Sequence, residues 1–295
     1  MHKLPFGLRT DKRYVALAMS RIRTIFCMTM LNLTLLGCGG DAPCKAWLAE
    51  ADIVDEVKVE IDSTLSVPVG AQILMAAYPR MKMQYLDNKI VFPDGTAITY
   101  DDGREKNFEE TLDNSDIEDM FSLPYDTIGE PGYLADAGRS RSEKLFKKMY
   151  GSSESKVKKV MVRVNWFGQD IPMTSVNGAA AQLKKVAEEL AQHPDLLEYL
   201  NSASTFYWRK VRGANRQSAH SYGIAIDINT SFSDYWLWDN EGICETDRIE
   251  YRNRIPLEIV QIFERHGFAW GGRWYHYDTM HFEYRPEIVW SRMNN

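Results

Sequence analysis

Two short histidine-containing segments near the C-terminus constrain this chain more than any other feature. The first reads Ser218-Ala-His-Ser-Tyr-Gly-Ile-Ala-Ile-Asp227, and the second reads Trp274-Tyr-His-Tyr-Asp-Thr-Met-His-Phe-Glu283. In the first, a histidine and an aspartate flank a glycine, whose missing Cβ allows a tight turn or a close backbone approach. The alternating residues 224–228 then predict a half-buried strand that aims Asp227 back towards His220.

These segments carry the side chains that a catalytic zinc site needs. Such a site takes three protein ligands from His, Asp, Glu or Cys and leaves a fourth position for water. His220, Asp227 and His281 supply that number, and Asp278 remains free to act as a base. In the alternative interpretation both histidines are ordinary surface residues and Asp227 is a turn residue. Residue types and spacing alone leave both interpretations open.

The same segments resemble a known peptidase family. The pattern Ser-x-His-x-x-Gly-x-Ala-x-Asp is followed by Trp-Gly-Gly-x-Trp and Asp-x-x-His-Phe-Glu, and the similarity runs from about residue 160 to the C-terminus. It is similar to the zinc D-alanyl-D-alanine carboxypeptidases and L-alanyl-D-glutamate endopeptidases that trim bacterial peptidoglycan. The resemblance implies that His220, Asp227 and His281 bind Zn²⁺ and that Asp278 is the general base.

We expect an α+β fold, in which a small antiparallel sheet carries the ligands and helices flank it, as in hedgehog-like and D-alanyl-D-alanine peptidases. Residues 157–167 alternate like a strand, and residues 177–192 show helical spacing. No catalytic motif marks residues 38–155, and the polar stretch at 152–155 is the preferred boundary. The zinc peptidase domain is therefore predicted at 156–295, after an additional N-terminal region of unknown role.

Two further residues are candidates for catalysis. In the resembling family an arginine near the position of Arg209 holds a carboxylate of the stem peptide, and a guanidinium has the forked geometry for that contact. Arg212 and Arg216 are alternatives. His276 would share a face with Asp278 if both lay on a strand, and it could then stabilise the oxyanion. A structural role is the alternative for His276.

Two other features allow a site interpretation beside a structural one. Residues 235–238 read Tyr-Trp-Leu-Trp and either cover the core or line a cleft, with core packing preferred. Arg139 follows a glycine turn and could approach the substrate, although an ion pair at a helix end is the preferred interpretation.

The N-terminus predicts export. Residues 1–37 read as a signal peptide, because arginines precede an apolar run too short to span a bilayer, and Met19 is an alternative start. The run ends Leu35-Leu-Gly-Cys38, which resembles a lipoprotein processing site with Cys38 as the lipidated residue. Plain cleavage of a signal peptide is the alternative. The predicted location is the bacterial cell envelope, with membrane attachment through a lipid on Cys38.

Net charge bears on nucleic-acid binding, and cysteine content bears on disulfide formation. Residues 1–37 hold six basic residues and one acidic residue, so the remainder is more acidic than the net charge of −6 for the whole chain. An acidic protein gains no counterion-release affinity for nucleic acid, and we expect no such partner. Cys44 and Cys244 could form a disulfide in an oxidising envelope, but their spacing does not establish one. The sequence does not determine an oligomeric state.

The predicted function is zinc-dependent hydrolysis of peptidoglycan stem peptides, with D-alanyl-D-alanine carboxypeptidase preferred. The alternatives are an L-alanyl-D-glutamate endopeptidase, a zinc peptidase that acts on proteins, and a non-catalytic zinc-containing module that binds the cell wall. A base at Asp278 disfavours the non-catalytic alternative.

Overall fold

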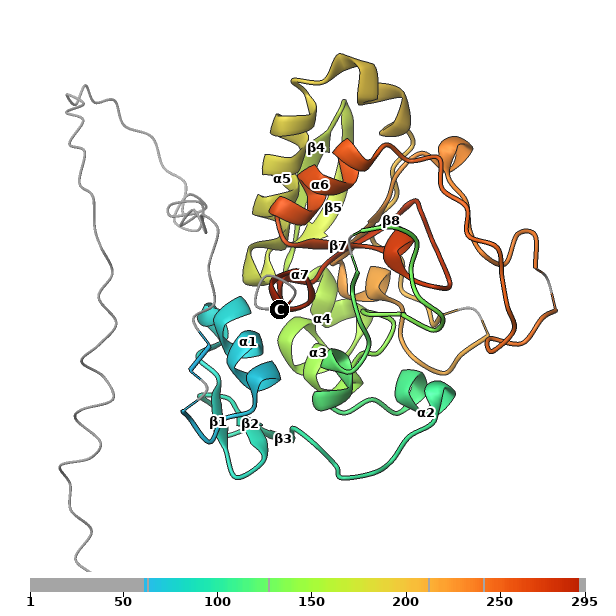
Figure 1. Cartoon of the computed structure of the whole chain (residues 1–295). Helices are drawn as coiled ribbons and strands as arrows, with labels where there is room; N and C mark the ends of the chain where they lie inside the picture. Colours follow the sequence, from blue (N-terminus) through green and yellow to red (C-terminus); the bar gives the residue numbers. More distant parts are fainter. Residues whose placement is uncertain (1–60, 63, 127, 212, 241, 292–295) are drawn as a thin grey trace, which may run out of the picture. The chain divides into compact units, whose positions relative to one another are not determined.

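The computed structural model describes residues 61–291 except 63, 127, 212 and 241, and Figure 1 shows the elements in chain order. Its helices are α1 (Val69–Ala77), α2 (Phe108–Asp113), α3 (Glu143–Tyr150), α4 (Glu154–Lys158), α5 (Ala179–Leu190), α6 (Leu257–Arg265) and α7 (Pro286–Ser291). Its strands are β1 (Gln84–Leu86), β2 (Lys89–Val91), β3 (Ala97–Thr99), β4 (Met161–Trp166), β5 (Gln169–Thr174), β6 (Ala225–Asp227), β7 (Phe268–Trp270) and β8 (His281–Tyr284). Within these residues no helix is both long enough and apolar enough to cross a membrane.

All strand pairing among these elements is antiparallel, and the fold class is α+β, as the sequence predicts. The strands form a sheet β1-β2-β3, a hairpin β4-β5 and a sheet in the order β6-β8-β7. The last sheet positions the site, because its register pairs Asp227 directly with His281. Opposed residues in an antiparallel pair bring their side chains together on one face. Two predicted ligands that are distant in sequence thus become neighbours.

Helix α5 illustrates how the apolar pattern builds the core around this sheet. Leu183, Val186 and Leu190 recur at intervals of three and four residues and are fully buried. The helix packs against β4 and α6, and in α6 Phe263 stacks on Phe282 of β8, with ring centroids 3.9 Å apart. The face of β8 opposite the site is therefore held by aromatic packing.

Gly223 allows the close approach that its motif predicts. Its φ is +66°, which an L side chain rarely adopts, and a Cβ there would lie 2.6 Å from Met161 Sδ. The glycine ends the short 3₁₀ turn Ala219–Tyr222 that carries His220. Because Gly223 has no side chain, the 3₁₀ turn and strand β6 can pack directly against the β4-β5 hairpin.

One local expectation is corrected by the structure, the start of the strand predicted at residues 157–167. Strand β4 begins at Met161 rather than 157, because α4 takes up residues 154–158.

The described residues on both sides of position 155 belong to one compact unit. The OH of Tyr78, the residue that follows α1, donates a hydrogen bond to Glu287 in α7, and both side chains are buried. The division at 155 stays a prediction. Cys244 is exposed, whereas Cys38, Cys44 and the predicted signal peptide lie outside the described residues.

Candidate metal centre and active site

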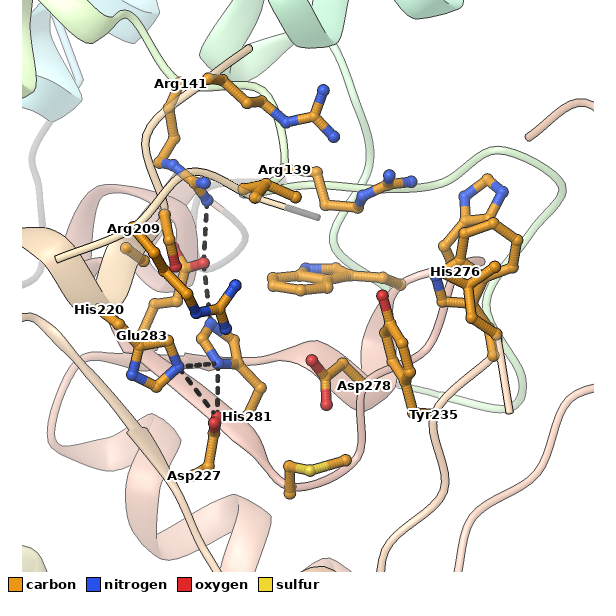
Figure 2. Close-up of a pocket in the computed structure, with 18 of the residues that line it drawn as sticks. Arg139, Arg141, Arg209, His220, Asp227, Tyr235, His276, Asp278, His281 and Glu283 are labelled. Atoms are coloured by element: carbon orange, nitrogen blue, oxygen red, sulfur yellow. Dashed lines mark hydrogen bonds and ion pairs between the residues drawn. The ribbon is translucent and has the colours of Figure 1, made fainter. Parts of the chain in front are cut away.

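Three side chains converge where β6 and β8 pair. The Nε2 atom of His220 lies 3.2 Å from Asp227 Oδ1 and 3.2 Å from His281 Nδ1, and these last two atoms are 2.8 Å apart. Figure 2 shows the three side chains pointing towards one another at one side of a pocket. His220 comes from the 3₁₀ turn, Asp227 ends β6 and His281 begins β8. The structure therefore brings together all three predicted ligands.

This triangle of atoms fits a zinc ion. With metal–ligand distances near 2.0–2.1 Å, tetrahedral geometry separates neighbouring ligand atoms by about 3.3 Å. The observed separations are close to that value, and two imidazoles with one carboxylate form a usual zinc donor set. Although burial opposes ionisation of Asp227, its two histidine neighbours lower the pKa of its carboxyl group. The carboxylate is consequently in the form that binds metal.

In each histidine, the ring nitrogen that faces away from the other metal-ligand candidates also makes a hydrogen bond. His220 Nδ1 donates to the carbonyl oxygen of Thr205, and His281 Nε2 donates to Glu283 Oε1 at 3.0 Å. These bonds leave the lone pairs of His220 Nε2 and His281 Nδ1 facing the site when the rings are neutral. Although burial opposes its charge, hydrogen bonds to Asp227 and Glu283 raise the pKa of His281 to about 10. Metal binding must therefore displace a proton from this ring.

Asp278 lies beside the three metal-ligand candidates, and one of its carboxylate oxygens is available as a hydrogen-bond acceptor. Its carboxylate points into the pocket in Figure 2, and its buried Oδ1 has no hydrogen-bond partner among the described residues. Burial raises the pKa of Asp278 to about 7, with the charge of Asp227 adding to the shift and those of His281 and Arg209 opposing it. A buried acceptor without a partner is costly in a folded protein. A water or a substrate group would satisfy it.

His276 has a different environment from the one predicted. It lies in a bend and not on a strand, so the expectation of a shared strand face with Asp278 is wrong. Its Nδ1 contacts Asp136 Oδ2 at 2.5 Å, and its Nε2 lies 2.8 Å from the carbonyl oxygen of Glu245. Both ring nitrogens thus contact protein atoms, and an oxyanion would have to compete for them.

The site opens into a cavity of about 400 Å³ that Arg209, Asp278 and the metal-ligand candidates all line. Arg209 is exposed, and its Nη1 donates one long hydrogen bond of 3.4 Å to the Lys210 carbonyl. Residues 235–238 form part of the cavity wall. Trp236 is buried there, whereas Trp238 is 54% exposed. This segment contributes both to packing and to the cavity lining.

Several residues of the site were not assigned a role from sequence. Glu283 lies two residues after His281 on β8, and the period of two along a strand is the signal that could have found it. Arg141 donates to Glu283 Oε1 at 2.9 Å. It lies far from both motifs in sequence, and no local pattern marks it. Arg139, for which the sequence favours an ion pair over a substrate contact, bridges Asp136 and Glu245.

Comparison with known proteins bears on the same segment. Residues 212–284 match a family model described as D-alanyl-D-alanine carboxypeptidase. The resemblance to this peptidase family is confirmed. The matched segment includes His220, Asp227, Asp278 and His281, while Arg209 precedes it. Searches of curated proteins and of solved structures give no match. The match supports a peptidase of the D-alanyl-D-alanine carboxypeptidase type, a family of metalloenzymes, and the His-Asp-His cluster is suited to bind a metal ion.

Proposed function

We propose that the protein is a zinc-dependent D-alanyl-D-alanine carboxypeptidase that acts on the stem peptides of bacterial peptidoglycan. One observation carries the proposal. Within the family-matched segment, three metal-ligand candidates converge to within 3.2 Å of one another, and Asp278, whose Oδ1 has no hydrogen-bond partner in the described part of the chain, lines the same cavity. Hydrolysis of a peptide bond needs a metal site and a base side by side.

In this proposal each residue of the site has its own role. His220, Asp227 and His281 hold zinc, which supplies Lewis-acid chemistry when bound. Asp278 accepts a proton from the attacking water and donates it to the leaving amine. The pKa of Asp278 is raised to about 7 in the metal-free protein, and the positive charge of bound zinc would favour the carboxylate form that accepts the proton. His276 contributes by positioning the cavity wall, since both of its ring nitrogens contact protein atoms.

We assign Arg209 to the terminal carboxylate of the substrate. Its guanidinium lines the cavity and is close enough to Asp278 to influence the pKa of that carboxyl group. A forked guanidinium next to the base suits a carboxylate adjacent to the scissile bond. Residues 235–238 and Arg139 also line the cavity.

The remaining parts of the proposal concern location. We propose export by residues 1–37 and attachment to the membrane through a lipid on Cys38, which would place the enzyme in the cell envelope beside its peptidoglycan substrate. Mass analysis of protein extracted from membranes tests this part, and an unmodified Cys38 would contradict it.

The activity is tested with a pentapeptide that ends in D-alanyl-D-alanine. The zinc-loaded protein should release one D-alanine, detected by mass spectrometry, and chelation should stop the release until zinc is restored. Asp278→Asn serves as the matched protein control. Cleavage between L-alanine and D-glutamate, with the D-alanyl end untouched, would instead identify the endopeptidase alternative. Absence of any metal-dependent cleavage would contradict the peptidase proposal.

A further inference from the structure

The cavity is rich in arginine although the chain as a whole is acidic. The net charge of the chain is −6, yet the described residues that line the cavity include four arginines and four carboxylates, namely Arg139, Arg141, Arg209, Arg216, Asp227, Glu245, Asp278 and Glu283. Arg139 and Arg216 also pair with Asp136 and Asp113, which lie outside that lining. The guanidinium donors that remain available to a ligand therefore decide what the cavity can bind.

The arginines fall into two groups. Arg209 is exposed and influences the pKa of Asp278. Arg141 and Arg216 are buried and Arg139 is largely buried. Figure 2 shows Arg141 joined to Glu283, which lies beside His281. Buried arginines are uncommon unless they are paired, so the partners of this second group decide what it can bind.

Two of the three buried arginines, Arg139 and Arg141, form ion pairs with protein carboxylates through several hydrogen bonds. Arg141 Nη1 donates to Glu283 and to the carbonyl oxygen of Gly138, each at 2.9 Å. Arg139 donates to Asp136 at 2.9 Å and to both oxygens of Glu245 at 3.0 Å. These bonds fix the two guanidinium groups at the cavity wall, each beside a carboxylate.

Arg216 is the least committed of the three. Among the described residues its hydrogen bonds go to one acceptor, Asp113 Oδ1, through Nη1. The Asp113 side chain is 43% exposed, so water competes for that contact. A guanidinium carries five N–H donors. Arg216 therefore retains donors for a ligand in the cavity that it lines.

The three charges also repel one another. Burial lowers the pKa of Arg216, and the charges of Arg139 and Arg141 lower it further, against the opposing effect of Asp113. Like charges held together in a partly desolvated cavity are unfavourable, and a bound anion relieves that repulsion. A carboxylate is the anion whose two oxygens match the fork of a guanidinium.

We infer that Arg216, supported by the fixed charges of Arg139 and Arg141, forms a second carboxylate subsite that selects peptides with an acidic side chain on the acyl side of the scissile bond. The inference rests on the proposed function in taking a peptide as the ligand. Arg209 would hold the terminal carboxylate next to the base, and the second subsite would hold a side-chain carboxylate further along the peptide. The ligand class is thus a peptide with two carboxylates.

The test compares two pentapeptides that both end in D-alanyl-D-alanine and differ at the third residue, which carries a free side-chain carboxylate in one and a primary amide in the other. The wild-type zinc enzyme should prefer the acid by about 10- to 100-fold in kcat/KM, as expected for charge-assisted hydrogen bonds. Arg216→Gln should reduce that ratio to about one. Arg163→Gln, which removes an exposed arginine on β4, is the control and should retain the preference.

Asp113→Asn supplies a second measurement that does not depend on the folding of Arg216→Gln. It removes the carboxylate that competes for Arg216, so the acid peptide should bind more tightly and the amide peptide should not. Equal binding of the two peptides by the wild-type protein would overturn the subsite. So would a preference for the acid that neither Arg216→Gln nor Asp113→Asn alters.

Calorimetric Kd values for both peptides separate this inference from the proposed function. If neither peptide is cleaved, but the wild-type protein binds the acid more tightly and Arg216→Gln removes that difference, the subsite stands and the peptidase proposal fails. If both peptides are cleaved at equal rates and bound with equal Kd, the peptidase proposal stands and the subsite is overturned.

Discussion

Glu283 Oε1 lies 3.0 Å from His281 Nε2, the ring nitrogen that faces away from the metal-ligand candidates. The same carboxylate accepts hydrogen bonds from Arg141 at 2.9 Å and from Arg285 at 3.3 Å. Both arginines and Glu283 are buried. Although burial opposes ionisation, Arg141 and His281 lower the pKa of Glu283 to about 2. A permanently charged carboxylate therefore orients the ring of His281, one of the metal-ligand candidates.

The first prediction concerns this support. Glu283→Gln keeps the size of the side chain but removes its charge, so His281 loses a charged acceptor that fixes its orientation. We expect zinc affinity to fall by about 10- to 100-fold, the usual effect of changing such a supporting group. Competition with a chelator measures the affinity. Glu188→Gln, a change at an exposed side chain of α5, is the matched control, and an equal loss in both variants would contradict the prediction.

The second prediction concerns protons released by metal binding. Because the pKa of His281 is raised to about 10 in the metal-free protein, its ring is protonated at neutral pH and must lose a proton to bind zinc. Apparent zinc affinity should therefore rise by about tenfold per pH unit between pH 6 and 8. Titration calorimetry in buffers of different ionisation enthalpy should detect about one released proton. An affinity independent of pH would show that His281 is already neutral or does not bind the metal.

The metal-ligand candidates could be predicted from sequence because their geometry is largely local. His220 and Asp227 lie seven residues apart across one glycine turn, and the apolar alternation of residues 224–228 marks the strand that aims Asp227. His281 required one further inference, that a second strand pairs with the first, and the motif resemblance supplied it. The register then places it opposite Asp227.

The supporting contacts could not be predicted because they join distant parts of the chain. Arg141 and Glu283 are 142 residues apart, and Asp136 and His276 are 140 residues apart. No period of 2 or 3.6 residues relates such positions. The strand expected around His276 failed for a related reason, since its backbone is held in a bend by Asp136, whose Oδ1 accepts its N–H at 3.0 Å.

The third prediction tests that long-range contact. Asp136 is fully buried and pairs with His276 and Arg139. Asp136→Asn leaves the charge of Arg139 with Glu245 as its remaining partner, and breaking a buried pair in this way costs about 3 kcal/mol of unfolding free energy. Chemical denaturation of the zinc-loaded protein measures the loss. Asp94→Asn breaks a pair with Lys148 in which the aspartate is 59% exposed, and its effect should be near zero.

This stabilisation should also depend on pH. Although burial opposes ionisation, Arg139 and His276 lower the pKa of Asp136 below its ordinary value. A lowered carboxyl pKa contributes stability above the unfolded value of about 4, and that contribution is lost as pH falls through the folded value. The difference between wild type and Asp136→Asn should therefore shrink below about pH 4. A difference that grows in acid would contradict the assigned charge state.

The last prediction concerns Asp278. Asp278→Asn keeps the shape of the side chain, but an amide cannot take up the proton that hydrolysis releases from water. We expect zinc content to be unchanged and kcat to fall by about 10²- to 10⁴-fold, the usual contribution of a general base.

The wild-type enzyme should lose kcat/KM as pH falls, because the base must be ionised. The midpoint should lie below the value of about 7 in the metal-free protein, since the positive charge of bound zinc favours the carboxylate. Metal analysis and pH-rate profiles on the pentapeptide measure these quantities together. Near-normal turnover with full zinc content in Asp278→Asn would assign the base to another residue, and a wild-type midpoint well above 7 would show that metal binding does not act on this carboxylate.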